Sequence, residues 1–240
     1  EPFLSSKHYK DMIGYFVEQA THRGIGISAV TNGYHLRKYL PLFKDALVRE
    51  IQITLDGTEE IHNKRRPLKG GSGTFDTIVK GIDACLTADI PVNLRVVVDK
   101  ENINNLAALS QFAIEKGWTK NSRFKTQLGR NYELHTCQQN TGILFDRLEM
   151  YKELYQLIRK NPEILEFHKP SFSIAKYLAE NSLLPGPLFD DCPGAKYEWA
   201  FDYKGNIYAC TATVGKSGEE VGTFYPEVNV YEDKISCWED

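Results

Sequence analysis

The residues best suited to chemistry gather in the segment 51–75. Apolar and polar residues alternate up to Thr54, and Asp56 then begins a turn at a glycine, as expected for a strand that ends in a polar loop. The residues that follow are basic, and a helix is predicted to begin near residue 75. The planar guanidinium of Arg66 suits a carboxylate or a phosphate. A solvent-exposed charged loop would show the same composition, so this segment alone leaves both interpretations open.

Helices and strands that alternate along the chain would position this segment. Apolar periodicity predicts strands at 25–30, 51–55, 91–99 and 124–128, and helices at 9–20, 36–49, 75–85, 102–117 and 145–165. Strands separated by helices form a parallel sheet, whose carboxyl ends meet at one rim. We therefore expect the polar residues at these ends to line one concavity: Thr31, Asn32, Thr54, Asp56, Arg66 and Arg95.

Arg95 is the exception in the clearest strand, the β-branched segment 91–99. A charged residue in the middle of such a strand lies at a sheet edge or, in a barrel, points into the lumen toward a ligand or substrate. The sequence leaves both positions open. Cys85, in contrast, shares the apolar face of the preceding helix and is predicted to be a small core residue.

Several short motifs resemble those of radical S-adenosylmethionine enzymes and occur in the order of that family. They are the opening Glu1-Pro2-Phe3-Leu4, the strand end Thr31-Asn32-Gly33, the turn Thr54-Leu55-Asp56-Gly57 with His62 and Arg66 after it, and the helix start Gly71-Ser72-Gly73-Thr74-Phe75. A series of motifs in the right order is more specific than any one of them.

The resemblance implies an α/β fold, a partial (β/α)6 TIM-like barrel whose first strands are missing. In this family three cysteines, spaced Cys-x3-Cys-x2-Cys, hold a 4Fe-4S cluster, and S-adenosylmethionine bound there yields a 5'-deoxyadenosyl radical. That spacing does not occur in this sequence, so the resemblance implies an inactive fragment with the cluster loop upstream.

The same resemblance implies a cofactor site at the strand ends. In it Glu1 would meet the methionyl amino group of S-adenosylmethionine, and Arg66 would hold the methionyl carboxylate. Polar contacts and further cofactor-binding candidates complete the set: Asn32, Thr54, Asp56 and Arg95.

The C-terminal part of the chain has a different character. Aromatic strands are predicted on both sides of Lys204-Gly205, whose turn chemistry indicates a tight hairpin. With Cys192 before it and Cys210 at its end, this part resembles the start of a SPASM domain, the appendage of peptide-modifying radical enzymes that binds auxiliary iron–sulfur clusters. The resemblance implies a barrel at 1–182, a truncated appendage at 183–240, and both cysteines as metal ligands. Filling of hydrophobic gaps is the alternative role for these thiols.

By this resemblance the parent protein is an enzyme that modifies a peptide or protein substrate by radical hydrogen abstraction, for example in thioether formation. An electron donor such as flavodoxin or ferredoxin would serve it. An anaerobic sulfatase-maturating enzyme is disfavoured because Thr211 stands where those relatives have an Asp. A non-catalytic peptide-binding module on the same scaffold is a second hypothesis, and an ordinary metabolic barrel enzyme is a third.

Composition excludes several other classes. Of the 240 residues, 42 % are hydrophobic and 25 % charged, which suits an ordered globular protein. A net charge of −3 offers no basic field for nucleic acid, and no apolar run or signal sequence points to a membrane, so the cytoplasm is the predicted compartment. The five cysteines are widely spaced, which disfavours a disulfide framework. A metal site at His135 and Cys137 is disfavoured, and Cys237 has no partner spacing.

Overall fold

The computed structural model describes residues 1–130, 141–170, 177–178, 180–183, 186 and 192–239. The chain divides into two compact units, Glu1–Ser171 and Phe172–Asp240. The division at 171/172 lies about eleven residues before the boundary predicted from sequence, and the assignment of barrel and appendage to 1–182 and 183–240 stays a prediction. No helix in the described part is long and apolar enough to span a bilayer.

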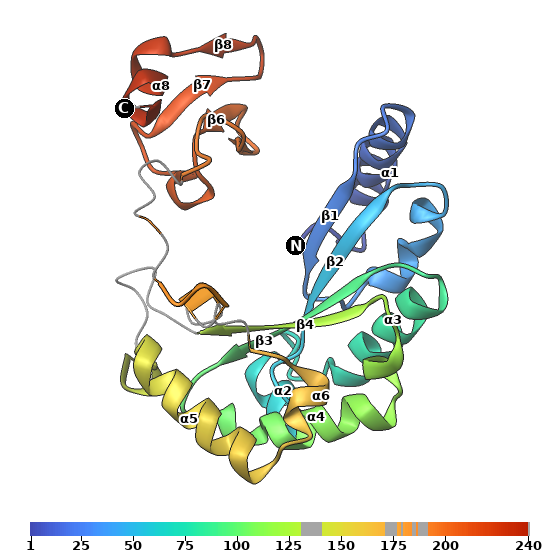
Figure 1. Cartoon of the computed structure of the whole chain (residues 1–240). Coiled ribbons are helices and arrows are strands. Elements are labelled where there is room, and N and C mark those ends of the chain that lie inside the picture. The colour runs from blue at the N-terminus through green and yellow to red at the C-terminus, as the bar shows by residue number, and fades with distance from the viewer. Residues whose placement is uncertain (131–140, 171–176, 179, 184–185, 187–191, 240) are drawn as a thin grey trace. The chain divides into compact units, whose positions relative to one another are not determined.

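Unit 1 is built on a four-stranded parallel sheet (Figure 1). Its strands are β1 (Ile27–Thr31), β2 (Val48–Thr54), β3 (Val92–Val98) and β4 (Phe124–Arg130), and they lie in sequence order. Every neighbouring pair is parallel, so each connection must cross back over the sheet before the next strand begins. This confirms the predicted α/β, partial TIM-like fold.

The two faces of the sheet differ in chemistry. Residues that point to one face are buried and apolar: Ile51, Ile53, Val92, Leu94, Val96 and Val98. Helices α3 (Phe75–Thr87) and α4 (Leu106–Glu115) lie on the same side of β3 and β4 (Figure 1) and bury their own apolar residues in the same core. Alternate residues point to the opposite face and are mostly polar, as expected where an incomplete barrel exposes its lumen side. They include Glu50, Gln52, Asn93, Arg95 and Gln127.

The segment after β1 differs from the expected helix at 36–49. It contains two short 3-10 helices, η1 (Leu36–Lys38) and η2 (Leu40–Phe43), before β2 begins at Val48. Pro41 lies at the start of η2 and lacks a backbone N–H, so no regular helix can run through it. The apolar residues of this segment pack on the N-terminal segment, where Phe3 contacts the rings of Tyr39 and Phe43.

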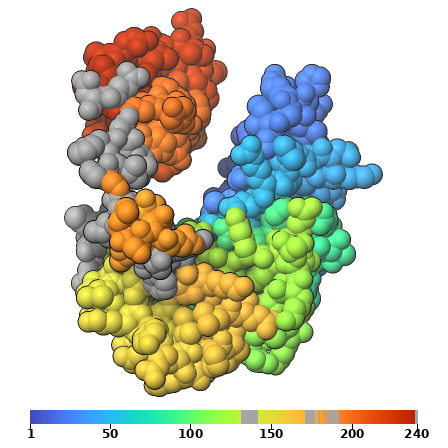
Figure 2. All heavy atoms as spheres, in the orientation of Figure 1, coloured from blue at the N-terminus to red at the C-terminus, as the bar shows by residue number. Residues whose placement is uncertain are grey.

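The described part of unit 1 contains four further α-helices. Helix α1 (Lys7–His22) buries Val17 and Ala20, and α2 (Glu59–Arg65) follows β2. The helix expected at 145–165, with Asn161-Pro162 as its cap, is α5 (Arg147–Lys160), which ends before Pro162, and the short helix α6 (Ile164–Phe167) follows. Helix α6 packs on α4, and Figure 2 shows the yellow and gold part of the chain beside the green part. Short 3-10 turns complete the unit: η3 (Ile103–Asn105), η4 (Trp118–Lys120) and η5 (Thr141–Ile143).

Unit 2 contains a small antiparallel sheet with the order β5-β6-β7-β8. Its strands are β5 (Ala200–Phe201), β6 (Asn206–Tyr208), β7 (Glu220–Thr223) and β8 (Asn229–Val230), with η6 (Thr211–Thr213) and α8 (Glu232–Glu239) beside them. The predicted hairpin at Lys204-Gly205 is confirmed, although its strands are shorter than expected. A separate core holds this unit together: Ala195, Ile207, Ala209, Val221 and Ile235.

A candidate cofactor pocket at the carboxyl ends of β1 and β2

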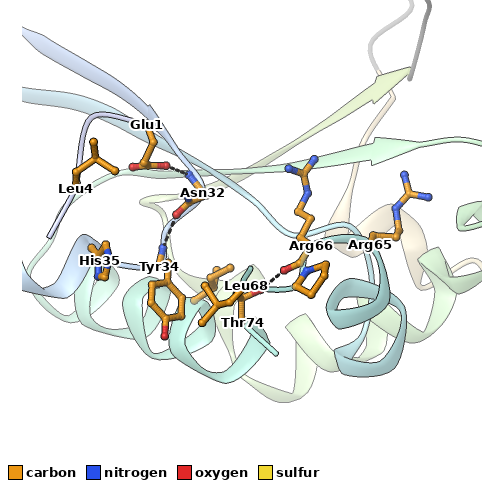
Figure 3. A pocket seen from close by; sticks show the side chains of 11 residues that line it. Glu1, Leu4, Asn32, Tyr34, His35, Arg65, Arg66, Leu68 and Thr74 are labelled. Carbon is orange, nitrogen blue, oxygen red and sulfur yellow. Dashed lines mark hydrogen bonds between the residues drawn. The ribbon is translucent and has the colours of Figure 1, made fainter. Parts of the chain in front are cut away.

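A pocket of about 430 Å³ lies at the carboxyl ends of β1 and β2. Figure 3 shows Glu1 and Asn32 on one side of it and Arg65 and Arg66 on the other. The lining residues come from the N-terminal segment, the end of β1, the segment after α2 and the start of α3: Glu1, Leu4, Asn32, Tyr34, His35, Arg65, Arg66, Pro67, Leu68, Thr74 and Ile78. An acidic group and guanidinium groups therefore face one space.

The carboxylate of Glu1 is held by the end of β1. One oxygen accepts hydrogen bonds from the Thr31 hydroxyl at 2.7 Å and the Phe3 N–H at 3.0 Å, and the other accepts the Asn32 N–H at 2.7 Å. Gly33 follows with a φ of 79°, and a Cβ there would lie 2.8 Å from Ile53 Cγ2. Glycine therefore permits the turn that presents the Asn32 N–H to the carboxylate.

The Arg66 side chain is oriented by a buried carboxylate behind it. Its Nε donates to Asp56 Oδ2 at 2.6 Å, while Asp56 Oδ1 accepts the backbone N–H of Val97 at 3.0 Å. Asp56 is 2 % exposed and the Arg66 side chain 41 % exposed, so the guanidinium reaches from a buried anchor into the pocket. Asp56 thus positions Arg66.

Arg65 differs from its neighbour. It forms a two-pronged ion pair with Asp99, with distances of 3.1 Å from Nη1 to Oδ1 and 2.7 Å from Nη2 to Oδ2. Only 17 % of its side chain is exposed, and it ties α2 to the end of β3. The sequence pointed to Arg66 but gave no sign that Arg65 has a structural role, because only the fold brings Arg65 next to Asp99.

His62 holds the same turn together from inside. Its Nδ1 accepts the backbone N–H of Asp56 at 3.1 Å, and its Nε2 lies 3.0 Å from the Thr74 hydroxyl. Because Thr74 donates its own proton to the Arg66 carbonyl at 2.8 Å, it must accept from His62, which fixes a neutral ring protonated on Nε2. Burial lowers the pKa of His62 to about 4, against the opposing charge of Asp56. The charged loop expected here is instead α2, with His62 fully buried.

The other predicted site residues lie elsewhere. Thr54 is buried at the end of β2, and Arg95 is its register partner on β3. Neither residue lines the pocket, whereas Glu1, Asn32 and Arg66 do. The Asn32 side chain accepts the Tyr34 N–H at 2.9 Å, so its oxygen also shapes the turn. The ligand-binding roles of all six residues stay predictions.

In the ranges that the structure describes, the cysteines do not gather as a site for the radical cluster. Cys85 is fully buried on α3, as predicted, and burial raises the pKa of its thiol to about 12. Among the described residues, no three His, Cys, Asp or Glu side chains gather as a metal site. His135 and Cys137 lie outside the described residues.

In unit 2 the neighbours of Cys192 and Cys210 come together. A Cβ built on Gly194 would lie 3.0 Å from the Ala209 carbonyl oxygen, so the segment that follows Cys192 lies against the end of the hairpin next to Cys210. Cys192 is exposed and Cys210 partly exposed, and both thiols are free. Their assignment as cluster ligands stays a prediction.

The parallel sheet and the pocket at its carboxyl ends can be compared with known proteins. Residues 1–113 match the family model described as the Radical SAM superfamily. This match covers a little under half of the chain and agrees with the resemblance seen in its motifs.

Curated relatives match the same part of the chain. Fe-coproporphyrin III synthase of Methanosarcina barkeri is 29 % identical over 91 residues, which cover 38 % of this chain and 22 % of that protein. GTP 3',8-cyclase of Campylobacter fetus is 30 % identical over 95 residues, covering 39 % of this chain and 29 % of that protein. The match thus spans less than a third of either relative.

A solved structure resembles the whole chain. Native anSMEcpe with bound AdoMet and the Cp18Cys peptide aligns with a TM-score of 0.66 and 14 % identity, covering 100 % of this chain and 68 % of that one. At this identity the likeness establishes the fold.

Proposed function

We propose that the pocket between Glu1 and Arg66 binds the methionyl part of S-adenosylmethionine. The observation that carries the proposal is the placement of opposite charges on two sides of one pocket of about 430 Å³. An amino acid carries an ammonium and a carboxylate on one carbon, so it is complementary to this pair. Glu1 accepts from the ammonium, and Arg66 donates to the carboxylate. Asn32, which lines the pocket at the end of β1, supplies a polar contact.

The residues around the pocket prepare it for this ligand. Asp56 holds Arg66 through Nε, which directs the outer edge of the guanidinium to the pocket. Hydrogen bonds from the end of β1 hold Glu1 in place before the ligand arrives. Both charges are thus preorganised, which reduces the entropy lost on binding.

We further propose that the parent protein is a radical enzyme acting on a peptide or protein. Bound S-adenosylmethionine supplies, in this family, the 5'-deoxyadenosyl group that takes a hydrogen atom from the substrate. This sequence lacks the Cys-x3-Cys-x2-Cys ligands of the radical cluster, so no step through that cluster is assigned to its residues. An electron donor of the flavodoxin or ferredoxin type belongs to the same proposal.

Support for a peptide substrate comes from two sides. The peptide-bound structure above shares the fold of this chain, and unit 2 contains the hairpin expected of a SPASM-like appendage. Thr211 in place of Asp argues for a modification other than formylglycine formation. A nucleotide substrate is the second candidate, because the GTP 3',8-cyclase relative is 30 % identical over the matched residues.

Calorimetric titration of the 240-residue chain tests the cofactor site. The probes are S-adenosylmethionine and 5'-methylthioadenosine, which lacks the amino-acid part. Arg66→Ala should weaken S-adenosylmethionine about 10- to 100-fold, the worth of a charge-assisted hydrogen-bond pair, and leave methylthioadenosine unchanged. Arg123→Ala is the matched control, since Arg123 pairs with Asp89 on the surface. Equal loss of both probes, or none, would refute the assignment.

A further inference from the structure

The polar face of the parallel sheet forms an organised row of side chains outside the pocket. Gln52 on β2 donates through Nε2 to Gln127 Oε1 on β4 at 2.6 Å, spanning β3 between them. Lys125 pairs with Glu50 at 2.5 Å on the same face. Asn93 and Arg95, two residues apart on β3, therefore lie under and beside a connected polar network.

Two buried polar atoms in this row have no hydrogen-bond partner within the described part of the chain: Asn93 Oδ1 and Arg95 Nε. Asn93 is 6 % exposed. Its Nδ2 faces two acceptors, Glu50 Oε1 at 3.4 Å and Gln127 Oε1 at 3.5 Å, which sets Oδ1 on the other side of the amide. A buried acceptor and a buried donor left without partners cost free energy. A ligand that pairs with both would remove that cost.

The guanidinium of Arg95 packs against Gly129 of β4. A Cβ on Gly129 would lie 3.2 Å from Arg95 Nε and 3.5 Å from Nη2, so the absence of a side chain there leaves room for the guanidinium. Gly129 is one of the last residues of β4. The positive group is therefore held toward the carboxyl ends of the strands, where ligands bind in parallel α/β folds.

The charge of Arg95 is also uncompensated among the described residues. Arg65 pairs with Asp99, and Arg66 with Asp56. Glu50, the acidic residue on the same face of the sheet, forms an ion pair with Lys125. No ion pair joins Arg95 to a carboxylate in the described ranges. A partly buried guanidinium without an anion is expected to attract one.

We propose that Arg95 and Asn93 form a substrate-recognition site for an oxyanion. Arg95 donates to a carboxylate or phosphate, and Asn93 Oδ1 accepts from an N–H or O–H of the same substrate. Residues two apart on a strand lie about 7 Å apart, so the anion and the donor are close neighbours in the ligand. A peptide carboxylate beside an amide N–H and a nucleotide phosphate beside a ribose hydroxyl both fit. This proposal rests on the proposed function, because it takes the oxyanion to be part of the substrate of the parent enzyme.

Paired probes separate the two sources of the oxyanion. The carboxylate arm uses N-acetyl-trialanine and its C-terminal amide, and the phosphate arm uses GMP and guanosine, each titrated into the 240-residue chain by NMR. In one arm the anionic member should bind about tenfold more tightly than its neutral twin, and Arg95→Gln should abolish that difference. Gly129→Ala should weaken the same probe because it displaces the guanidinium. Arg123→Gln is the matched control and should change nothing.

Three results would overturn the site. The first is equal affinity for the anionic and neutral probes in both arms. The second is a preference for the anionic probe that Arg95→Gln leaves unchanged. The third is an Arg95→Gln protein that loses affinity for S-adenosylmethionine but not for the anionic probe. Failure of the cofactor assignment is separate, since Arg66→Ala should not alter the oxyanion preference. Folding is checked with Arg95→Met, whose thermal midpoint should equal or exceed that of the wild type, because it removes an unpaired buried charge.

Discussion

The imidazole of His62 accepts the backbone N–H of Asp56 through Nδ1 at 3.1 Å, inside the turn that follows β2. A protonated ring has no lone pair on that nitrogen, so the contact requires neutral histidine. Burial is the main cause that lowers the pKa of His62 to about 4 from its ordinary value of 6.5. The folded protein therefore binds the proton less readily than the unfolded chain.

His62 should make the stability of unit 1 depend on pH. A lowered folded-state pKa gives stability that is fully present above pH 6.5 and is lost as the pH falls toward 4. The loss over this range is of order 3 kcal/mol. Urea unfolding at pH 7 and pH 5 should show about 2 kcal/mol of this loss. His62→Gln should lose most of this slope, whereas His22→Gln, an exposed control at the end of α1, should retain it. Identical slopes in both variants would contradict the role of His62.

Asp56 and Arg66 should act as one unit in ligand binding. Asp56→Asn removes the charge that holds Arg66 Nε, so S-adenosylmethionine should bind several-fold more weakly although Asp56 does not line the pocket. The same change should destabilise the fold by about 1 kcal/mol, because Asp56 is buried but the Arg66 side chain it pairs with is 41 % exposed and stays solvated.

A double-mutant cycle with Arg66→Ala separates the binding effect from general damage. If Asp56 works through Arg66, Asp56→Asn should add little to the affinity loss of Arg66→Ala, with a coupling of about 1 kcal/mol or more. Additive losses would mean that Asp56 acts on the ligand by another route.

The parallel sheet could be predicted from the sequence because each of its strands has a recognisable pattern of apolar residues. The segment 91–99 is β-branched and became β3, and the alternation before Thr54 became β2. Segment 36–49 is predicted as a helix that Pro41 can split in two, and the structure has two short 3-10 helices there in place of an α-helix. The apolar pattern therefore predicts where a helix or strand lies more reliably than whether a helix is of the α or the 3-10 type.

The candidate site was less accessible to sequence reasoning. Arg65 and Arg66 are adjacent and chemically alike, and only the tertiary position of Asp99 assigns Arg65 a structural role. Arg95 was noticed as an anomaly, yet its separation from the pocket depends on which face of β3 it occupies. Gly129 leaves space for the Arg95 guanidinium, but nothing in a single sequence indicates that these two residues are in contact.

Cysteine reactivity should divide the chain by burial. Cys85 has no exposed surface and a thiol pKa raised to about 12, so very little thiolate is present near pH 8. Iodoacetamide should label Cys192 and Cys237, which are exposed, long before Cys85. Peptide mass spectrometry over time measures the order. Rapid labelling of Cys85 in the native chain, at the rate seen in urea, would show that α3 is not packed as described.

Glu1 should recognise the ammonium of the cofactor, and its anchor at the end of β1 should matter as well. Glu1→Gln keeps the shape but removes the charge, so binding of S-adenosylmethionine should weaken about tenfold, the lower range for a charge-assisted hydrogen bond. Methylthioadenosine, without an ammonium, should bind both proteins equally. Thr31→Val removes the 2.7 Å hydrogen bond to the carboxylate and should cause a smaller loss of the same selectivity.

The two substitutions distinguish charge recognition from simple support of the turn. If Glu1 only braces β1, Thr31→Val and Glu1→Gln should lower the unfolding midpoint together and affect both probes alike. If it binds the ammonium, the Glu1→Gln effect should shrink as salt increases, because the charge interaction is screened at the open side of the pocket. A salt-independent loss shared by both probes would leave Arg66 as the cofactor contact and remove Glu1 from the site.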